Sequence, residues 1–225
     1  MNDSPLVLSI AVLGGTGKEG KGLAYRWAKA GYHVFIGSRS ADKAKAAAQD
    51  LWKMLEGNGL VEGLTNQEAA QKADVVVLTV PFDAHRQTLE SVKGFIKGKL
   101  LVDVSVPLVP PKVTKVQMPP AGSAAQEAKQ ILGGEAEIAS AFQNISYEHL
   151  LLDQDIECDV LVTGTSKEAR SEALKLVSAA GLTGWDAGPL ENSVVLEGLT
   201  SVLININKQY GSTHAGIKIT GVRKT

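Results

Sequence analysis

Residues 6–20 read LVLSIAVLGGTGKEG, a short apolar run that leads directly into closely spaced glycines. The apolar run from Leu6 to Leu13 predicts a strand buried inside a sheet. Gly15, Gly17 and Gly20 then fit the spacing G-x-G-x-x-G, and a predicted helix opens at this motif. A strand, this glycine spacing and a helix in that order are typical of a unit that binds a dinucleotide.

Each glycine of the motif has its own physical reason. Gly15 allows a tight turn, Gly17 lets the backbone approach a pyrophosphate, and Gly20 lets helix and strand pack closely. Free backbone N–H groups at the start of the helix can then bind the phosphates. Two other interpretations are a turn without a ligand and a loop for nucleoside triphosphates. The latter is disfavoured because Gly22 takes the place of the Ser or Thr that would ligate Mg²⁺.

The end of the second predicted strand indicates which dinucleotide binds. Residues 33–37 read HVFIG, and Ser38 and Arg39 follow with no Asp or Glu at the strand end. An NAD site uses an acidic residue there for the ribose 2′-hydroxyl, whereas an NADP site uses a cation for the 2′-phosphate. Arg39 can bind a phosphate through two N–H groups, Ser38 adds a hydroxyl, and Lys43 follows one helical turn later. The sequence therefore predicts NADP as the cofactor.

The chain alternates apolar strand patterns with helix patterns as far as Val104. This alternation predicts an α/β fold with a Rossmann-type doubly wound parallel sheet. Residues 106–120 hold five of the eight prolines and predict a crossing loop. A break near residues 144–153 predicts an NADP-binding domain, residues 1–144, and a small C-terminal α/β lobe, residues 145–225. We expect further strands at 33–37, 74–81, 100–104, 137–142 and 159–164, and helices at 23–30, 41–55, 84–92, 123–132, 167–180 and 190–207, with a short helix from residue 66.

Composition excludes several classes of protein. The 225 residues carry 23 basic and 24 acidic side chains, a net charge of −1, which excludes a strongly basic nucleic-acid binder. No stretch reaches the roughly 20 apolar residues of a membrane-spanning helix, and the N-terminus lacks the basic start of a signal peptide. Cys158 is the only cysteine, so no disulfide within the chain is possible. We expect a cytoplasmic protein that binds neither nucleic acid nor membrane.

The predicted NADP unit has no obvious acid or base beside it, and we assign no catalytic residue. An enzyme that oxidises an alcohol needs such a group near the hydride. We expect His33 and His85 to be structural or solvated, Cys158 to be inert, and leave His149 and His214 open. No spacing of His, Cys or carboxylate residues indicates a metal. Hydride transfer between two redox cofactors suits such a site, because the protein then mainly holds two rings face to face.

Several segments carry a resemblance to a known family. They are residues 11–17 (AVLGGTG), 37–39 (GSR), 77–81 (VLTVP), 186–193 (DAGPLENS), 197–200 (EGLT) and 216–218 (GIK). In this order they resemble the NADPH-dependent reductases of the deazaflavin coenzyme F420, over nearly the whole chain. The resemblance implies reversible hydride transfer between NADP(H) and coenzyme F420. It also implies that the deazaflavin lies in a cleft between a Rossmann domain and a small C-terminal lobe.

The resemblance further implies which residues bind the cofactors. Around NADP they would be Gly15 in the glycine motif, Thr16, Gly17, Lys18 and Glu19 at the pyrophosphate, Ser38, Arg39 and Lys43 at the 2′-phosphate, and Val80 and Pro81, with Thr79 before them, at the nicotinamide. Around the deazaflavin they would be Ala141 and Gln143 near the place where the rings meet, and Gly216 and Ile217 closing over the ring. Gln143 and Ser146 depart from the family, which often has His and Pro at these places.

Two other functions stay open at this point. An NADP-dependent reductase of another small acceptor, such as an imine, a flavin or a ferric chelate, would work without a deazaflavin. A non-catalytic NADP sensor would bind NADP tightly and turn nothing over. The helix predicted at 190–207 has more apolar residues than one buried face needs. We therefore expect a homodimer whose other partners are the two small-molecule redox cofactors.

Overall fold

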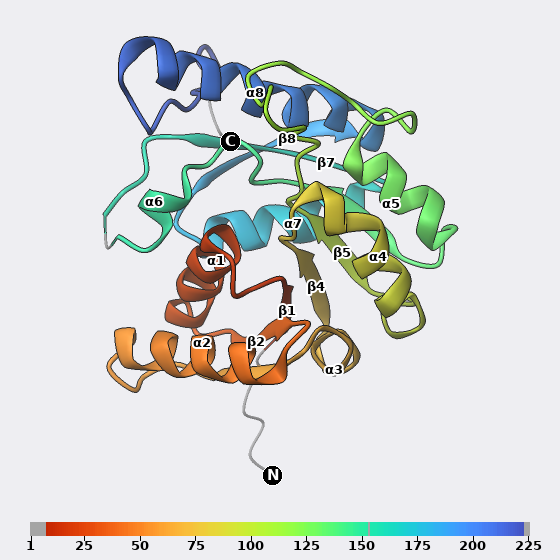
Figure 1. The fold of residues 1–225 in the computed structure, drawn as a ribbon, viewed down its shortest axis with the longest axis vertical. Coiled ribbons are helices and arrows are strands. Elements are labelled where there is room, and N and C mark those ends of the chain that lie inside the picture. Colours follow the sequence, from red (N-terminus) through yellow and green to blue (C-terminus); the bar gives the residue numbers. More distant parts are fainter. Residues whose placement is uncertain (1–7, 153, 223–225) are drawn as a thin grey trace.

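The computed structural model describes residues 8–152 and 154–222, and their strands form one sheet (Figure 1). The strands are β1 (Ser9–Leu13), β2 (His33–Ser38), β3 (Val61–Thr65), β4 (Val75–Leu78), β5 (Leu100–Asp103), β6 (Glu137–Ser140), β7 (Asp159–Gly164) and β8 (Thr183–Pro189). Their order in the sheet is β3-β2-β1-β4-β5-β6-β7-β8. Neighbouring strands pair in parallel, except that β6 and β7 are antiparallel.

Helices cover both faces of this sheet. They are α1 (Lys18–Lys29), α2 (Ala41–Met54), α3 (Asn66–Lys72), α4 (Phe82–Val92), α5 (Ala124–Leu132), α6 (Tyr147–Leu150), α7 (Lys167–Ala179) and α8 (Ser193–Tyr210), with single 3₁₀ turns at Lys93–Phe95 and Leu190–Asn192. One face packs against α1, α2 and α7, and the other against α3, α4 and α5 (Figure 1). The predicted Rossmann-type doubly wound sheet is confirmed.

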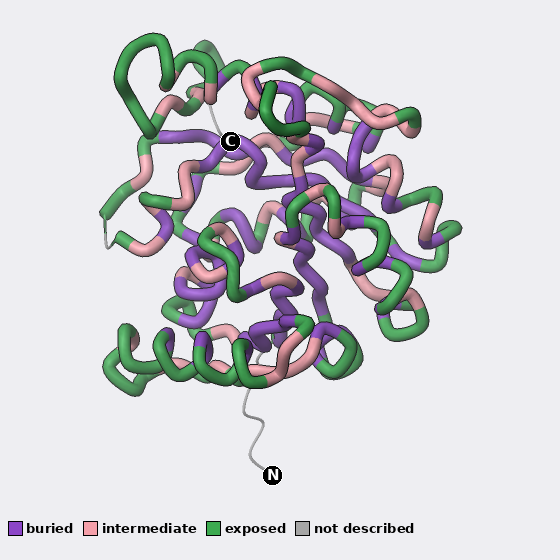
Figure 2. The backbone as a smooth tube through the Cα atoms, in the orientation of Figure 1, coloured by how far each residue is buried: buried purple, intermediate pink, exposed green. Residues whose placement is uncertain are grey.

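The strand β1 shows why the sheet needs apolar residues in unbroken runs. Ile10 and Val12 belong to the core under α1, α2 and α7, whereas Ala11 and Leu13 belong to the core under α3, α4 and α5. Successive side chains of a strand point to opposite faces, so burial on both faces requires an apolar residue at every position. The central strands are accordingly buried along their length (Figure 2). Residues 6 and 7 of the predicted strand lie outside the described residues.

The strand order places a crevice above β1 and β4. From β1 the chain builds outward to β2 and β3, and then returns to place β4 on the other side of β1. Leu13 and Leu78, the last residues of β1 and β4, lie opposite each other. The connections after these two strands turn to opposite faces, which leaves a ligand crevice at the carboxyl ends of the strands. The glycine loop begins at this place.

Two strands and one short helix, β3, β8 and α6, were not expected from the sequence. The strands β3 and β8 are the two edges of the sheet and are only partly buried. Edge strands do not need a continuous apolar run, and both contain glycines and acidic residues. The predicted helix 190–207 is displaced, because a 3₁₀ turn occupies Leu190–Asn192 and α8 continues to Tyr210.

The C-terminal part of the chain extends the same sheet. The strand β7 joins β6 through the pairs Ala139 with Gly164 and Ser140 with Thr163. The helix α8 then lies across the sheet above the ends of β7 and β8 (Figure 1). The division predicted between residues 144 and 145 stays a prediction.

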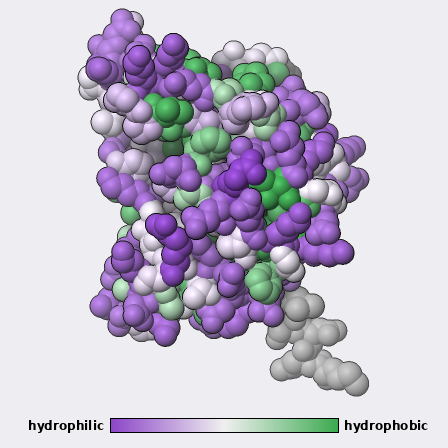
Figure 3. All heavy atoms as spheres, turned by 45° about the vertical axis from the view of Figure 1, so that its right-hand side comes forward, coloured by the Kyte–Doolittle hydropathy of each residue, from purple (hydrophilic) through white to green (hydrophobic). Residues whose placement is uncertain are grey.

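The surface is mostly hydrophilic in the view of Figure 3, with separate hydrophobic patches between the polar side chains. Among the described residues, no helix combines the length and the apolar character needed to cross a membrane.

Candidate active site

The glycine loop connects the end of β1 to the start of α1 with little room for side chains. Gly14 has the left-handed φ of 76°, and a Cβ atom there would lie 2.7 Å from Val80 Cγ1. A Cβ atom on Gly20 would overlap Thr79 Oγ1 and lie 2.8 Å from Gly15 Cα. The left-handed residue therefore precedes the G-x-G-x-x-G motif by one position, whereas the close packing of helix and strand falls on Gly20 as the motif predicts.

The start of α1 leaves backbone donors available. Gly17 occupies the N-cap position, and no side chain accepts a hydrogen bond there. The first N–H groups of a helix have no partner inside the helix, and the helix dipole adds a partial positive charge. The glycine loop thus presents an uncapped helix start that suits a pyrophosphate.

A cavity of about 260 Å³ extends from the glycine loop to the end of β2. Thr16 and Gly17 line one side, and Ser38, Arg39 and Lys43 line the other. Ser38 is buried, while Arg39 and Lys43 are exposed. Within residues 8–152 and 154–222, Arg39 forms no ion pair. Two cations and a hydroxyl without an acidic partner form a donor set that suits the 2′-phosphate of NADP.

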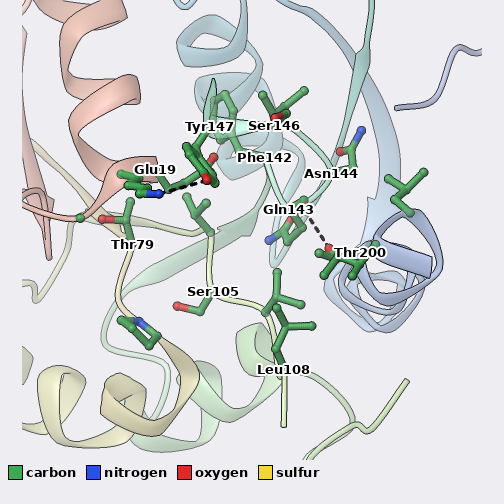
Figure 4. Close-up of a pocket in the computed structure, with 18 of the residues that line it drawn as sticks. Glu19, Thr79, Ser105, Leu108, Phe142, Gln143, Asn144, Ser146, Tyr147 and Thr200 are labelled. Atoms are coloured by element: carbon green, nitrogen blue, oxygen red, sulfur yellow. Dashed lines mark hydrogen bonds between the residues drawn. The ribbon is translucent and has the colours of Figure 1, made fainter. Parts of the chain in front are cut away.

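A larger cavity of about 500 Å³ lies between the strand ends and α8 (Figure 4). Its walls are mostly apolar, and its polar side chains come from separate elements, among them Lys18 and Glu19 from α1, Gln143 after β6, and Thr200 from α8. The Thr200 hydroxyl donates to the backbone carbonyl of Gln143 at 2.7 Å (Figure 4). An apolar cavity with few polar groups is typical of a site for a flat organic ring.

The two cavities share part of their walls. Gly17, Thr79, Val80 and Pro81 line both of them. Thr79 continues from β4, and its side chain donates to the carbonyl of Leu13 at 2.9 Å, which ties the ends of β4 and β1 together. The structure therefore brings the residues predicted for the nicotinamide to the boundary between the cavities.

Not every predicted residue lies where the resemblance implied. Lys18 and Glu19 line the larger cavity rather than the one that reaches Arg39. Ala141 is fully buried and lines neither cavity. Gly216 lines a third cavity of about 330 Å³ beside Cys158, together with His149 and His214.

The two residues near the C-terminus contact Cys158 instead of the larger cavity. A Cβ atom on Gly216 would lie 2.6 Å from Cys158 Sγ, so close packing on the thiol already explains this glycine. The N–H of Ile217 donates to the same sulfur at 3.4 Å, and its carbonyl accepts from the N–H of Asp159 at 2.8 Å. Burial raises the pKa of Cys158, consistent with an inert thiol.

The side-chain amide of Gln143 has a hydrogen-bonded nitrogen and an oxygen without a partner. Its Nε2 donates to the Asp103 carbonyl and to Ser140 Oγ, both at 2.8 Å. Since the Asp103 carbonyl can only accept, the amide oxygen must point away, and Oε1 is buried without a partner. The preceding Phe142 has a φ of 75°, rare for a bulky residue, and its ring packs edge-on against Trp27. A strained turn thus places Gln143, with an unpaired acceptor, in the wall of the larger cavity.

Glu19 is the carboxyl group of the larger cavity. Its Oε1 is buried without a hydrogen-bond partner, although the residue as a whole keeps part of its surface. Burial raises the pKa of Glu19 from its ordinary 4.5 to about 8. A carboxylate in the first turn of a helix gains only about 0.3–1 kcal/mol from the helix dipole. This gain is less than one pKa unit is worth, so burial decides the direction.

A buried polar network that the sequence did not reveal supports the cavity from behind. His85 Nε2 lies 2.7 Å from Asp103 Oδ2, and its Nδ1 lies 3.4 Å from Glu127 Oε1. Burial lowers the pKa of His85, but the two carboxylates outweigh burial and raise it overall. Asp103 Oδ1 also accepts a hydrogen bond from the N–H of Ser105, a residue that lines the larger cavity. His85 is thus structural, as expected, but as part of an ionic network.

A second buried acid joins α8 to α5. Glu197 is fully buried, and its two oxygens accept from the N–H groups of Ala124 at 2.6 Å and Ala125 at 3.1 Å. Glu197 therefore caps the start of α5 from another helix. No helical or strand periodicity indicates such a contact. Among the described residues, no group of His, Cys, Asp and Glu could hold a metal ion.

Comparison with known proteins agrees with this geometry. The family described as NADP oxidoreductase, coenzyme F420-dependent, matches residues 9–107. The F420-dependent NADP reductase of Methanothermobacter marburgensis is 43% identical over 223 residues, which cover 96% of this chain and 99% of that protein. The enzyme of the same name from Methanocaldococcus jannaschii is 38% identical over 223 residues, with the same coverage.

A solved structure has the same fold. It is a putative F420-dependent NADP reductase from Arthrobacter sp. FB24, with a TM-score of 0.77 and 24% identity, covering 94% of this chain and 98% of that one. At this identity the likeness concerns the fold, whereas the two reductases from Methanothermobacter marburgensis and Methanocaldococcus jannaschii match over nearly their full lengths at higher identity. This chain belongs to the family of F420-dependent NADP reductases.

Proposed function

We propose that this chain transfers a hydride reversibly between NADP(H) and the deazaflavin coenzyme F420. Family membership over nearly the whole chain supports the reaction. The observation that carries the proposal is the shared wall of two cavities at Thr79, Val80 and Pro81. When both are bound, NADPH supplies the hydride from its nicotinamide ring and the deazaflavin accepts it.

The residues around the smaller cavity fit NADP. The N–H groups at the start of α1, with Gly15, Thr16 and Gly17, would hold the pyrophosphate. Arg39, Lys43 and the Ser38 hydroxyl would hold the 2′-phosphate. The fit rests on a helix start that Gly17 does not cap with a side chain, and on two cations that form no ion pair within the described residues. These interactions would fix the nicotinamide end at Thr79, Val80 and Pro81.

The larger cavity fits a flat ring with polar edges. Val80, Pro81 and Leu108 supply apolar wall, and the unpartnered Gln143 Oε1 offers an acceptor for an N–H group at the ring edge. Lys18 donates to the Tyr147 hydroxyl at 3.2 Å and closes the cavity on the α1 side. Ala141 would set the position of Gln143 from behind, and Gly216 and Ile217 would hold the C-terminal segment against Cys158.

The protein's part in the reaction is to orient the two rings and to exclude water. Together with the bound rings, the apolar residues beside Pro81 would keep bulk solvent from the space where the rings would meet. The strand ends that carry Thr79 and Ser105 are held by hydrogen bonds to Leu13 and Asp103. Orientation of this kind contributes a large share of catalysis when both reactants already carry the reactive group.

The proposal is tested by mixing purified protein with NADPH and oxidised coenzyme F420 and following the deazaflavin absorbance. Loss of the absorbance with NADPH, and much slower loss with NADH, is the expected result. Binding of NADPH without loss of the absorbance would contradict the proposal. Turnover of an imine, a flavin or a ferric chelate would then identify another reductase, and the absence of all turnover would identify a sensor.

The assembly and location of the enzyme also belong to this proposal. Val194, Val195, Val202 and Ile206 on α8 are exposed apolar residues that a homodimer contact would cover. Sedimentation should give twice the chain mass, and Val195→Asp should give the single-chain mass, whereas Leu60→Asp at the β3 edge should not. We place the enzyme in the cytoplasm, where it would meet both of its redox partners.

A further inference from the structure

Glu19 has a position that binding of a pyrophosphate does not explain. It is the second residue of α1, but it lines the larger cavity and not the one that reaches the 2′-phosphate residues. Figure 4 shows its side chain at the cavity wall on the same side as Tyr147, with Thr200 of α8 on the other side. Its Oε1 atom is buried and has no hydrogen-bond partner. A buried polar atom without a partner is rare in folded proteins, and a catalytic role is one of its explanations.

The surroundings of Glu19 favour the neutral acid. The other titratable side chains that line the cavity are Lys18 and Tyr147. The Lys18 ammonium is directed at Tyr147, 3.2 Å from its hydroxyl and 4.8 Å from its ring centre. The lining residues from the ends of β4 and β5 and from α8 carry no charge.

On the α6 side, Glu148 and the two rings of His149 and His214 interact with one another. Burial therefore acts on Glu19 largely unopposed, and its pKa of about 8 leaves the carboxyl group mostly protonated at neutral pH. A pyrophosphate bound at the start of α1 would add negative charge nearby, and this raises the pKa of a neighbouring carboxyl group further.

The reaction itself requires a proton. NADPH loses only a hydride when it becomes NADP⁺, whereas a deazaflavin gains a hydride and a proton when it is fully reduced. We propose that the carboxylic acid of Glu19 donates this proton to the acceptor ring in the larger cavity and takes it back in the reverse reaction. The proposal rests on the proposed function, and it makes Glu19 a proton donor instead of a residue that lines the pyrophosphate.

The step balances without any further reactant. The C–H bond at C4 of the nicotinamide breaks with both of its electrons, and a C–H bond forms on the acceptor ring. The O–H bond of Glu19 breaks, and its proton passes to a ring nitrogen. A carboxylate is left, which regains a proton from water, since part of the Glu19 surface is accessible. A donor with a pKa near the working pH is effective in both directions.

The first test needs no cofactor. Infrared difference spectra of the free protein should show the C=O band of a protonated carboxyl group that disappears as the pH rises through about 8. Burial raises the pKa of Glu197 to about 8 as well, so the band should lose the share of one carboxyl group in Glu19→Gln and stay unchanged in Glu168→Gln. Glu168 is the matched control, because it is also the second residue of its helix, α7, but is exposed. A band at pH 7 that is as strong in Glu19→Gln as in the wild type, or no band that titrates near 8, would overturn the proposal.

The second test follows a single turnover of hydride transfer between pH 6 and 10. With NADPH as donor, the wild-type rate should fall above pH 8, and in the reverse direction it should rise there. In Glu19→Gln, both the fall of the forward rate and the rise of the reverse rate should be absent, and hydride transfer should be about 10²-fold slower. Glu168→Gln should match the wild type. An unchanged pH dependence of the rate in Glu19→Gln would show that water supplies the proton. If the wild-type protein transfers no hydride at all, the proposed function fails, and the infrared titration still decides the state of Glu19.

Discussion

Arg39 lies at the end of β2 with its guanidinium exposed and, within the part of the chain described, without an ion pair. Arg39→Ala should raise the KM for NADPH about 10- to 100-fold, because a hydrogen bond to a charged group is worth roughly 1.5–3 kcal/mol. The KM for NADH should change little, since NADH has no 2′-phosphate. Lys53→Ala, at the other end of α2, is the control. Equal effects of Arg39→Ala on both dinucleotides would contradict the assignment of NADP.

Substitutions of Gly17 and Gly20 should have different effects, the first on NADP binding and the second on stability. A Cβ atom on Gly17 would meet only the Gly14 carbonyl, at 3.3 Å, and its φ of −74° suits any residue. Gly17→Val should therefore keep nearly the wild-type melting temperature but lose NADP binding in calorimetry, because the side chain occupies the pyrophosphate site. Gly20→Val should instead lower the melting temperature, since it overlaps Thr79. Retained NADP binding by folded Gly17→Val would show that the pyrophosphate lies elsewhere.

Among the helices, α5 and α8 are joined by the carboxyl group of Glu197. Glu197→Ala should lower the free energy of unfolding by about 2–4 kcal/mol, because it leaves two buried N–H groups unpaired at about 1–3 kcal/mol each. Glu197→Gln keeps one acceptor and should lose roughly half as much. Urea unfolding of the three proteins measures the difference. An unchanged midpoint for Glu197→Ala would mean that other groups satisfy the start of α5.

The sequence was sufficient for those elements and residues whose role depends on local pattern. The runs at 10–13, before the glycine loop, and at 75–78 are apolar throughout because both strands are buried on two faces. Arg39 could be found because its position follows from the strand end alone. The edge strands β3 and β8 could not be predicted from the sequence, because partial exposure permits a mixture of polar and apolar residues.

The residues missed at the site act through contacts that are distant in the sequence. His85 and Asp103 are separated by 18 positions and Glu197 and Ala124 by 73, and no periodicity connects them. The sequence also could not predict which cavity the Glu19 side chain lines, since its position in the helix does not distinguish between two adjoining cavities. The orphaned oxygen of Gln143 depends on the same packing.

For the molecule as a whole, stability should fall as the pH rises from about 6.5 to 8. Among the described residues, folding raises the pKa of three groups that titrate in this range, which are Glu19 and Glu197, each to about 8, and His85. A group with a raised pKa contributes stability that is present below its unfolded pKa and lost as the pH rises through its folded pKa. Glu68, Asp74, Glu137 and His149, whose pKa values folding lowers, act below this range. Lys99, whose pKa is lowered, and Cys158, whose pKa is raised, act above it.

Urea midpoints measured from pH 6 to 9 test this dependence. The wild-type midpoint should decline between pH 6.5 and 8 and then level off. Glu19→Gln should show a shallower decline, because one of the three titrating groups is gone, and Glu168→Gln should follow the wild type. A midpoint that rises over this range would contradict the raised pKa values.

The central claim is that two rings meet beside Thr79, Val80 and Pro81, the residues that line both cavities, and exchange a hydride directly. It is tested most directly with NADPH that carries deuterium at the transferred position of C4, oxidised coenzyme F420 and ordinary water. The account predicts one deuterium on carbon in each reduced deazaflavin, with none lost to solvent. Reduced deazaflavin whose new C–H hydrogen comes from water would contradict direct transfer between the two cavities.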